Sequence, residues 1–340
     1  MAIKKAEETL RTREGIMSGH NKYLFLSEEE QTFKKEYRYM EEQRRLLAFA
    51  NEQYGSISDT YILFAVAKLG VTDRKTIQEF LKVLFMHDRE KFILDPDDDD
   101  AYGKRISALC RFGFLFKISY FHNIQDKIGT PHALYTITSD GVNFVKARLS
   151  CHLMANQWIQ SKTFQELLAW AAASYVGVKL SQSKHFRSFE EGIFRNRNTG
   201  AHYYPCECKF VLEENEEYFP VYAVTMNCYL QRDTRIMSED DFASHKAFKV
   251  NAIRNYIRYR SKKGPCYVFC VVMDNDDLMD MGELLVEAEV PEEELDHIYF
   301  TGVGAFDESR KVKVPYLKMK LEETEDTISF DFYTDMPFFL

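Results

Sequence analysis

The sequence predicts an α+β protein of two domains: a winged helix-turn-helix domain over residues 57–149 and an α/β domain over residues 150–340, preceded by a helical extension over residues 1–56. Three observations lead to this fold class. The 340 residues exceed what one hydrophobic core usually organises. Three helical patterns followed by two strand patterns lie within the first domain. A long helical pattern, then strands separated by a further helix, lies within the second.

The composition is that of a globular protein, with 45% hydrophobic and 14% aromatic residues. No run of about 18 apolar residues is present, and the first residues lack the apolar stretch of a signal peptide. We therefore expect a cytoplasmic protein with no membrane partner. The seven cysteines form no paired framework, so neither a metal site nor a cofactor is predicted.

The net charge of −9 disfavours a protein that coats nucleic acid indiscriminately. The charge is uneven, however. Residues 101–150 hold seven Lys or Arg against two Asp, whereas the chain from Asp274 onward holds nineteen acids against five bases. A nucleic-acid face is therefore expected in the first domain, and a solvated or partner-binding surface in the acidic C-terminal part.

A long helix is expected in the N-terminal extension. Ser27 supplies an N-cap with Glu30 three residues on, and apolar residues recur from Phe33 toward Gly55. Such a helix either covers the winged domain or joins two copies of the chain in a homodimer.

The first two helices of the winged domain are indicated by their ends. Ser58 or Asp59 can cap the first helix, and Gly70 ends it. Thr76 and Glu79 predict a capping box for the second helix. Each helix has an apolar stripe at helical spacing, so both are expected to pack on one core.

A third helix lies within residues 101–113, and β-rich segments at residues 114–120 and 133–138 flank a polar turn. A last helix follows a cap at Thr138 or Ser139. Three helices followed by a hairpin predict the winged fold. The polar positions of the third helix carry Lys104, Arg105 and Arg111.

This third helix is expected to enter the major groove of duplex DNA. Lys104 and Arg105 lie in its N-terminal half, where an Arg side chain can read guanine through O6 and N7. Lys117 and Lys127, near and in the wing, are expected to meet phosphates and set the register. The predicted DNA-binding residues are therefore Lys104, Arg105, Arg111, Lys117 and Lys127. Each of these residues can instead be an ordinary lysine or arginine on the solvent-exposed surface.

One feature opposes DNA binding. The run from Asp95 to Asp100 directly precedes the third helix and repels phosphate at short range. Either Asp99 or Asp100 caps that helix while the other acids face away from DNA, or the acids cover the helix face. In the second case the winged domain is a protein-interaction module.

The second domain begins with a helical stretch over residues 150–177 that includes Trp170 as an expected core contact. A basic amphipathic helix with Lys246, Lys249, Arg254, Arg258 and Arg260 is expected either to cover the sheet or to add a second DNA contact. Strands are expected around it, at residues 202–212, 219–229, 265–274 and 297–303.

This combination of a winged domain, the run from His152 to Asn156, paired strands, a Lys- and Tyr-rich helix and an apolar strand resembles the replication-relaxation family. The family belongs to Gram-positive plasmids and conjugative elements. The resemblance covers residues 57 to about 302 and implies that the second domain is similar to the restriction-endonuclease core.

In that core, a Pro-Asp and a Glu-x-Lys or Glu-x-Asp hold a divalent metal, which needs hard oxygen ligands. Here Cys206 follows Pro205, and the next strand reads Ala223-Val224-Thr225, so the resemblance implies a dismantled site. An alternative metal site uses the E-x-K formed by Glu207 and Lys209 with Glu190 or Glu191 on the preceding helix. Such a short motif also arises by chance.

Three functions follow as hypotheses. The first is a non-catalytic DNA-binding accessory protein of a plasmid or conjugative element, acting in replication, transfer or their regulation, with duplex DNA and a replication or transfer protein as partners. The second is a metal-dependent nuclease that uses Glu207 and Lys209. The third is a protein-interaction scaffold whose winged domain no longer binds DNA.

Overall fold

The computed structural model describes residues 33–36, 57–86, 94–95, 97–120, 132–151, 153, 164–190, 193–195, 202–205, 207–225, 266–273, 275–306, 316–322 and 327–333, with part of 250–258. These residues combine helices and sheets, as the predicted α+β class requires. They fall into two compact units that divide after Ser174. None of the described helices is long and apolar enough to cross a membrane.

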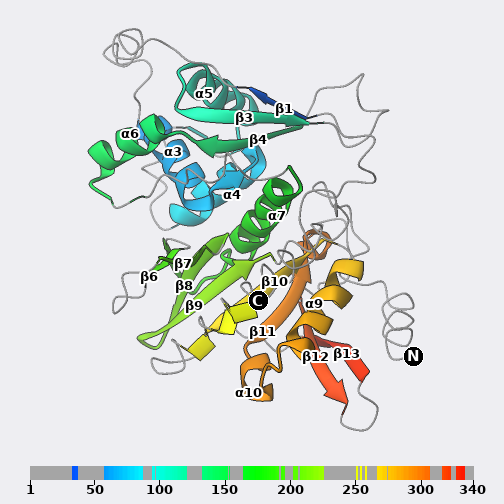
Figure 1. Ribbon diagram of the computed structural model, residues 1–340. Helices are drawn as coiled ribbons and strands as arrows, with labels where there is room; N and C mark the ends of the chain where they lie inside the picture. Colours follow the sequence, from blue (N-terminus) through cyan, green and yellow to red (C-terminus); the bar gives the residue numbers. More distant parts are fainter. Residues whose placement is uncertain are drawn as a thin grey trace. The chain divides into compact units, whose positions relative to one another are not determined.

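The first unit holds helices around an antiparallel sheet (Figure 1). The sheet order is β1-β3-β4-β2, so the short strand β2 pairs with β4 and the strand β1 pairs with β3. The elements are β1 (Phe33–Glu36), α3 (Ile57–Leu69), β2 (Val71–Thr72), α4 (Arg74–Leu84), α5 (Asp99–Arg111), β3 (Leu115–Tyr120), β4 (His132–Ile137) and α6 (Ser139–Leu149).

Helix α3 is the centre of this unit. Ile62, Leu63, Ala65 and Val66 are fully buried, and the helix contacts α4, α5 and α6. Fully burying such side chains is worth about 1.5–3 kcal/mol each for the larger ones. The apolar sides of the surrounding helices therefore pack on one common core.

The helix ends follow capping chemistry. Thr138 caps α6 by accepting a hydrogen bond from the Gly141 backbone N at 3.1 Å, as predicted. Helix α4 differs from the prediction, because its cap is Asp73, which accepts from the Thr76 backbone N at 2.9 Å. The expected capping box at Thr76 is therefore wrong by one turn, and the Thr76 side chain is buried inside α4.

The expected long N-terminal helix is wrong at residues 33–36, which form the strand β1. Strand β1 pairs antiparallel with β3, from Phe33 opposite Tyr120 to Glu36 opposite Lys117. The backbone groups along that edge of β3 thereby gain hydrogen-bond partners, which outweighs the local helix signal. The remainder of the predicted extension lies outside the described residues.

Helix α7 (Phe164–Leu180) contains the division between the units, which lies after Ser174, whereas the sequence predicts a boundary after residue 149. Within the first unit, Trp170 is buried, as expected of a core contact. The Trp170 Nε1 and the Ser174 hydroxyl each donate to the Leu69 carbonyl oxygen at 2.9 Å. This carbonyl lies at the C-terminal end of α3, where the helix itself offers no donor.

The second unit is built on a seven-stranded sheet of order β13-β12-β11-β10-β9-β8-β5. Strands β9, β10 and β11 are mutually parallel and the other pairs are antiparallel. Strands β6 (Ile193–Arg195) and β7 (His202–Pro205) form a separate pair. The sheet strands are β5 (Phe186–Glu190), β8 (Cys208–Glu214), β9 (Glu217–Val224), β10 (Tyr267–Val272), β11 (Ile298–Gly302), β12 (Tyr316–Glu322) and β13 (Thr327–Tyr333).

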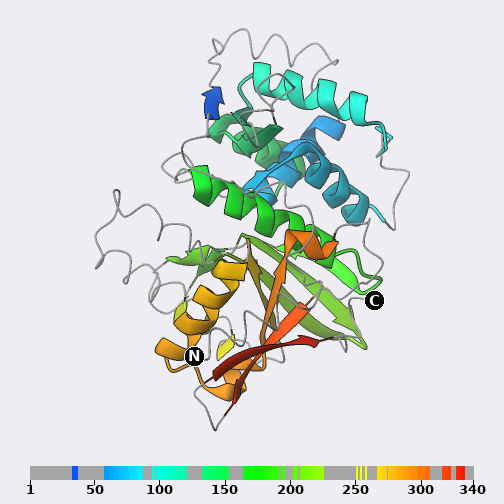
Figure 2. The same ribbon diagram turned by 90° about the vertical axis from the view of Figure 1, so that its right-hand side faces the viewer.

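Helices cover both faces of this sheet. On one face, α9 (Asn275–Glu287) packs with helical residues of 250–258 over Val268, Cys270 and Val272 (Figure 2). On the other face, Gly177 of α7 lies against Cys208 of β8. The central strands are therefore continuous apolar runs, as is typical of parallel sheets. The short helices α10 (Glu292–Leu295) and η7 (Val303–Phe306) flank β11.

Replacing Gly70 by Ala tests the junction between α3 and Trp170. Gly70 has a φ of +74°, and a Cβ at this position would lie 2.9 Å from the Trp170 indole. Backbone strain and steric overlap together predict a loss of about 2–4 kcal/mol in the free energy of unfolding. The measurement is urea unfolding followed by circular dichroism; an unchanged midpoint would contradict the close packing of Trp170 on Gly70.

Candidate nucleic-acid interface

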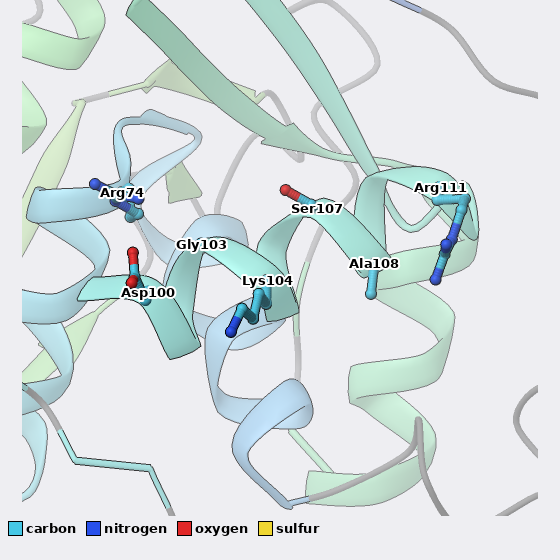
Figure 3. Close-up of a pocket in the computed structure, with 7 residues that line it drawn as sticks. All are labelled: Arg74, Asp100, Gly103, Lys104, Ser107, Ala108 and Arg111. Atoms are coloured by element: carbon cyan, nitrogen blue, oxygen red, sulfur yellow. The ribbon is translucent and has the colours of Figure 1, made fainter. Parts of the chain in front are cut away.

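A shallow hollow of about 750 Å³ lies along the solvent side of α5. Six of its lining residues come from α5 at spacings of three and four, so they share one side of the helix (Figure 3). We call this set the α5 face: Asp100, Gly103, Lys104, Ser107, Ala108 and Arg111. The seventh lining residue is Arg74, from the first turn of α4.

The core determines which side of α5 is exposed. Tyr102, Ile106 and Leu109 are at most 2% exposed and point into the first unit. Burial raises the pKa of Tyr102 to about 12, with a smaller contribution from Asp95, so this phenol is neutral at physiological pH. The opposite side, the α5 face, is therefore directed to solvent.

The α5 face combines small residues with cationic ones. Gly103, Ser107 and Ala108 leave the helix backbone open to close approach, while Lys104 and Arg111 are exposed. In Figure 3, Lys104 lies near the middle of the helix and Arg111 at its C-terminal end. Such a surface can sit closely against a partner and still offer hydrogen-bond donors.

Arg74 crosses α5 at Gly103. Its Nη2 donates to the Asp99 Oδ2 at 2.9 Å, and a Cβ on residue 103 would lie 2.8 Å from its Nη1. Because glycine has no Cβ, Gly103 leaves room for the half-exposed Arg74 guanidinium beside the α5 face. This room has a cost, since glycine inside a helix is about 1 kcal/mol less favourable than alanine.

The aspartate run that precedes α5 is largely engaged within the protein. Asp95 accepts from the Asp97 backbone N at 3.0 Å, and Asp97 pairs with the Lys82 Nζ at 2.6 Å. The hydrogen bond that the Lys82 Nζ donates to Asp97 raises the pKa of Lys82 above its usual value. Asp98 caps α5 by accepting from the Ala101 backbone N at 2.9 Å. The expected cap at Asp99 or Asp100 is therefore wrong by one residue.

Three polar side chains of the α5 face have no hydrogen bond or ion pair within the part of the chain that the structure describes: Asp100, Lys104 and Ser107. Their neighbours Asp97, Asp98 and Asp99 are all engaged. The polar groups that remain available to a ligand are thus gathered along the hollow.

Arg105 is partly buried and paired with a carboxylate. Its Nε donates to the Asp59 Oδ1 at 2.8 Å and its Nη2 donates to the other carboxylate oxygen. Asp59 is only 2% exposed and lies within the first turn of α3, so the cap expected there is instead the buried partner of Arg105. Because its guanidinium is paired with Asp59, Arg105 differs from the freely solvated recognition residue that the sequence predicts.

The other predicted contacts are not gathered at the hollow. Lys117 lies on β3, half-buried, opposite Glu36 of β1 and Tyr135 of β4, and does not line the hollow. Lys127 lies outside the described residues. Of the five predicted residues, the structure brings together Lys104 and Arg111. Arg74 was missed because its position depends on an ion pair with a residue 25 positions away.

In the second unit, the E-x-K residues have separate partners. The Glu207 carboxylate is 4% exposed and accepts from the Thr225 backbone N at 3.2 Å. The Lys209 Nζ pairs at 2.5 Å with Glu190, which lies on the strand β5 and not on a helix as expected. Glu191 lies outside the described residues.

The described residues contain no group of three His, Cys, Asp or Glu side chains placed to hold a metal ion. Between Glu207 and Lys209 lies Cys208, and burial raises the pKa of its thiol to about 12. The described residues around the E-x-K therefore do not fit the hard-oxygen ligand set that a divalent metal requires.

The predicted basic helix is described only in part. Arg254 and Arg258 donate to the two oxygens of Glu294 at 2.8 and 2.5 Å. Lys246, Lys249 and Arg260 lie outside the described residues.

Comparisons of the chain with protein-family models, with curated proteins and with solved structures found no match.

Replacing Arg105 by Ala should lower the free energy of unfolding by about 3 kcal/mol, because it leaves the buried Asp59 carboxylate without its cation. Urea unfolding measures this loss. Arg111→Ala, on the exposed α5 face, is the matched control and should change stability by less than about 0.5 kcal/mol. The double variant Asp59→Leu with Arg105→Met should recover part of the loss. Equal stability of the two single variants would contradict a buried ion pair.

Proposed function

We propose that the first unit is a winged helix-turn-helix domain that binds duplex DNA through the α5 face. The order of helix, short strand, two helices and hairpin supports this assignment, together with the pairing of β2 to β4 in the sheet order β3-β4-β2. In this fold the third helix enters the major groove. Helix α5 occupies that position.

The α5 face is the observation that carries this proposal. From Asp100 to Arg111 it extends about 16 Å along the helix axis, at 1.5 Å per residue. The major groove is about 12 Å wide and admits an α-helix. The small residues at its centre allow the backbone to approach the bases, and the unpaired side chains of Lys104 and Ser107 reach base edges.

The cations around this face have separate roles. Lys104 donates to guanine O6 or N7, since Lys is a common reader of these acceptors. Arg111 and Arg74, at the margin of the hollow, contact phosphates and set the register. Arg105 has no assigned contact with DNA, because its guanidinium is paired with Asp59.

The chain as a whole acts as a non-catalytic accessory protein in the replication or transfer of a mobile element. The second unit supports this, since the order α7, β5, β8, β9, helix, β10 with β9 parallel to β10 is similar to the endonuclease core, yet Glu207 and Lys209 are engaged with Thr225 and Glu190. The second unit provides a surface for a replication or transfer protein or for a second copy of the chain.

Lys104→Ala and Arg111→Ala are each expected to weaken binding to duplex DNA. Loss of either side chain should lower the affinity for duplex DNA by about 1–3 kcal/mol. Loss of a phosphate contact should also reduce the slope of log K against log salt concentration by about 1. Fluorescence anisotropy with a labelled random duplex, at salt concentrations from about 50 to about 200 mM, measures the affinity and its salt dependence.

Lys184→Ala, an exposed lysine of the second unit, is the control and should leave affinity unchanged. Thermal unfolding checks that every variant is folded. If the intact protein binds no duplex at the lowest salt, the DNA-binding proposal is wrong and the first unit is a protein-interaction module.

A further inference from the structure

Asp100 differs from the other aspartates of its run. Asp97 and Asp99 are paired with Lys82 and Arg74, and Asp98 caps α5. Asp100 alone lines the hollow, exposed and without a hydrogen bond or ion pair in the described residues. A carboxylate on a surface that approaches DNA is unfavourable unless it meets a donor, because phosphates repel it.

The major groove offers such donors at only two bases. Cytosine presents its 4-amino group, and adenine presents its 6-amino group beside the acceptor N7. A carboxylate can only accept hydrogen bonds, so the adjacent N7 of adenine opposes it. Cytosine, which has no such acceptor beside its amino group in the groove, is the base that fits Asp100.

Lys104 lies four residues after Asp100 on the same side of α5. This spacing corresponds to about 6 Å along the helix axis, which is less than two base-pair steps of about 3.4 Å. An acceptor and a donor thus meet the same or neighbouring base pairs. Lys104 supplies the donor for guanine O6 and N7, while Asp100 supplies the acceptor for cytosine.

We infer that Asp100 is a specificity-determining residue of the α5 face: it accepts a hydrogen bond from the 4-amino group of cytosine and, with Lys104, selects duplexes that contain a G·C pair at this point. The inference rests on the proposed DNA binding. Asp100 would then discriminate between DNA sequences, and its negative charge would lower the affinity for DNA of unrelated sequence.

The test is selection of bound duplexes from a randomised pool by the intact chain and by three variants. The unaltered protein should enrich duplexes with cytosine at one position, preferred by about 5- to 150-fold over the other bases. Asp100→Ala should lose the preference at that position only and bind unselected duplex more tightly. Asp100→Asn should shift the preference toward adenine, which an amide reads through N6 and N7.

Asp97→Asn is the matched control, because it removes one negative charge from the same run without altering the α5 face. It should raise affinity for all duplexes and keep the cytosine preference. The inference is wrong if duplexes are bound but Asp100→Ala keeps the cytosine preference, or if the unaltered protein has no cytosine preference. Either result leaves the proposed DNA binding in place. Absence of any duplex binding by the unaltered protein overturns both.

Discussion

The buried pair between Asp59 and Arg105 is the constraint on which the exposed surface of the first unit depends. It joins the first turn of α3 to α5, and α3 is the helix that the rest of the unit covers. A guanidinium bound through two nitrogens to one carboxylate allows little rotation of α5 about its axis. With Tyr102 and Leu109 buried on the same helix, the pair determines that Lys104 and Arg111 face solvent. Arg105, which has no assigned contact with DNA in the proposed function, thus helps to decide which residues of α5 face solvent.

The same logic of pairing explains how an acidic run can lie beside a surface that carries Lys104 and Arg111. Asp97 and Asp99 form ion pairs with α4, and Asp98 satisfies an unpaired N–H group of the first turn of α5. Carboxylates at this end of a helix also interact favourably with the helix dipole. The run therefore stabilises the start of α5 and fastens it to α4. Its repulsion of phosphate is reduced wherever a cation lies within hydrogen-bond distance.

Patterns that depend on near neighbours were predicted correctly from the sequence. Examples are the end of α3 at Gly70 and the cap at Thr138. Features that depend on distant partners were not. Lys104 and Arg105 are adjacent polar residues, and a carboxylate 46 positions before Arg105 pairs with Arg105. Strand β1 likewise exists through its pairing with β3, and Asp73 displaced the expected cap at Thr76 because several capping residues lie within one turn.

For the proposed DNA binding, a net charge of −9 means that the chain as a whole provides little long-range attraction, although residues 101–150 are locally basic. Counterion release supplies much of the affinity of strongly basic proteins, and here few cations are available on the α5 face to provide it. The proposed binding then depends on short-range contacts that form only when α5 is in register with the major groove. Such contacts vanish on duplexes of the wrong sequence, whereas phosphate contacts do not. The sparse charge of the α5 face and its central Gly103, Ser107 and Ala108 are therefore compatible with the proposed DNA binding only if that binding is restricted to a few sites.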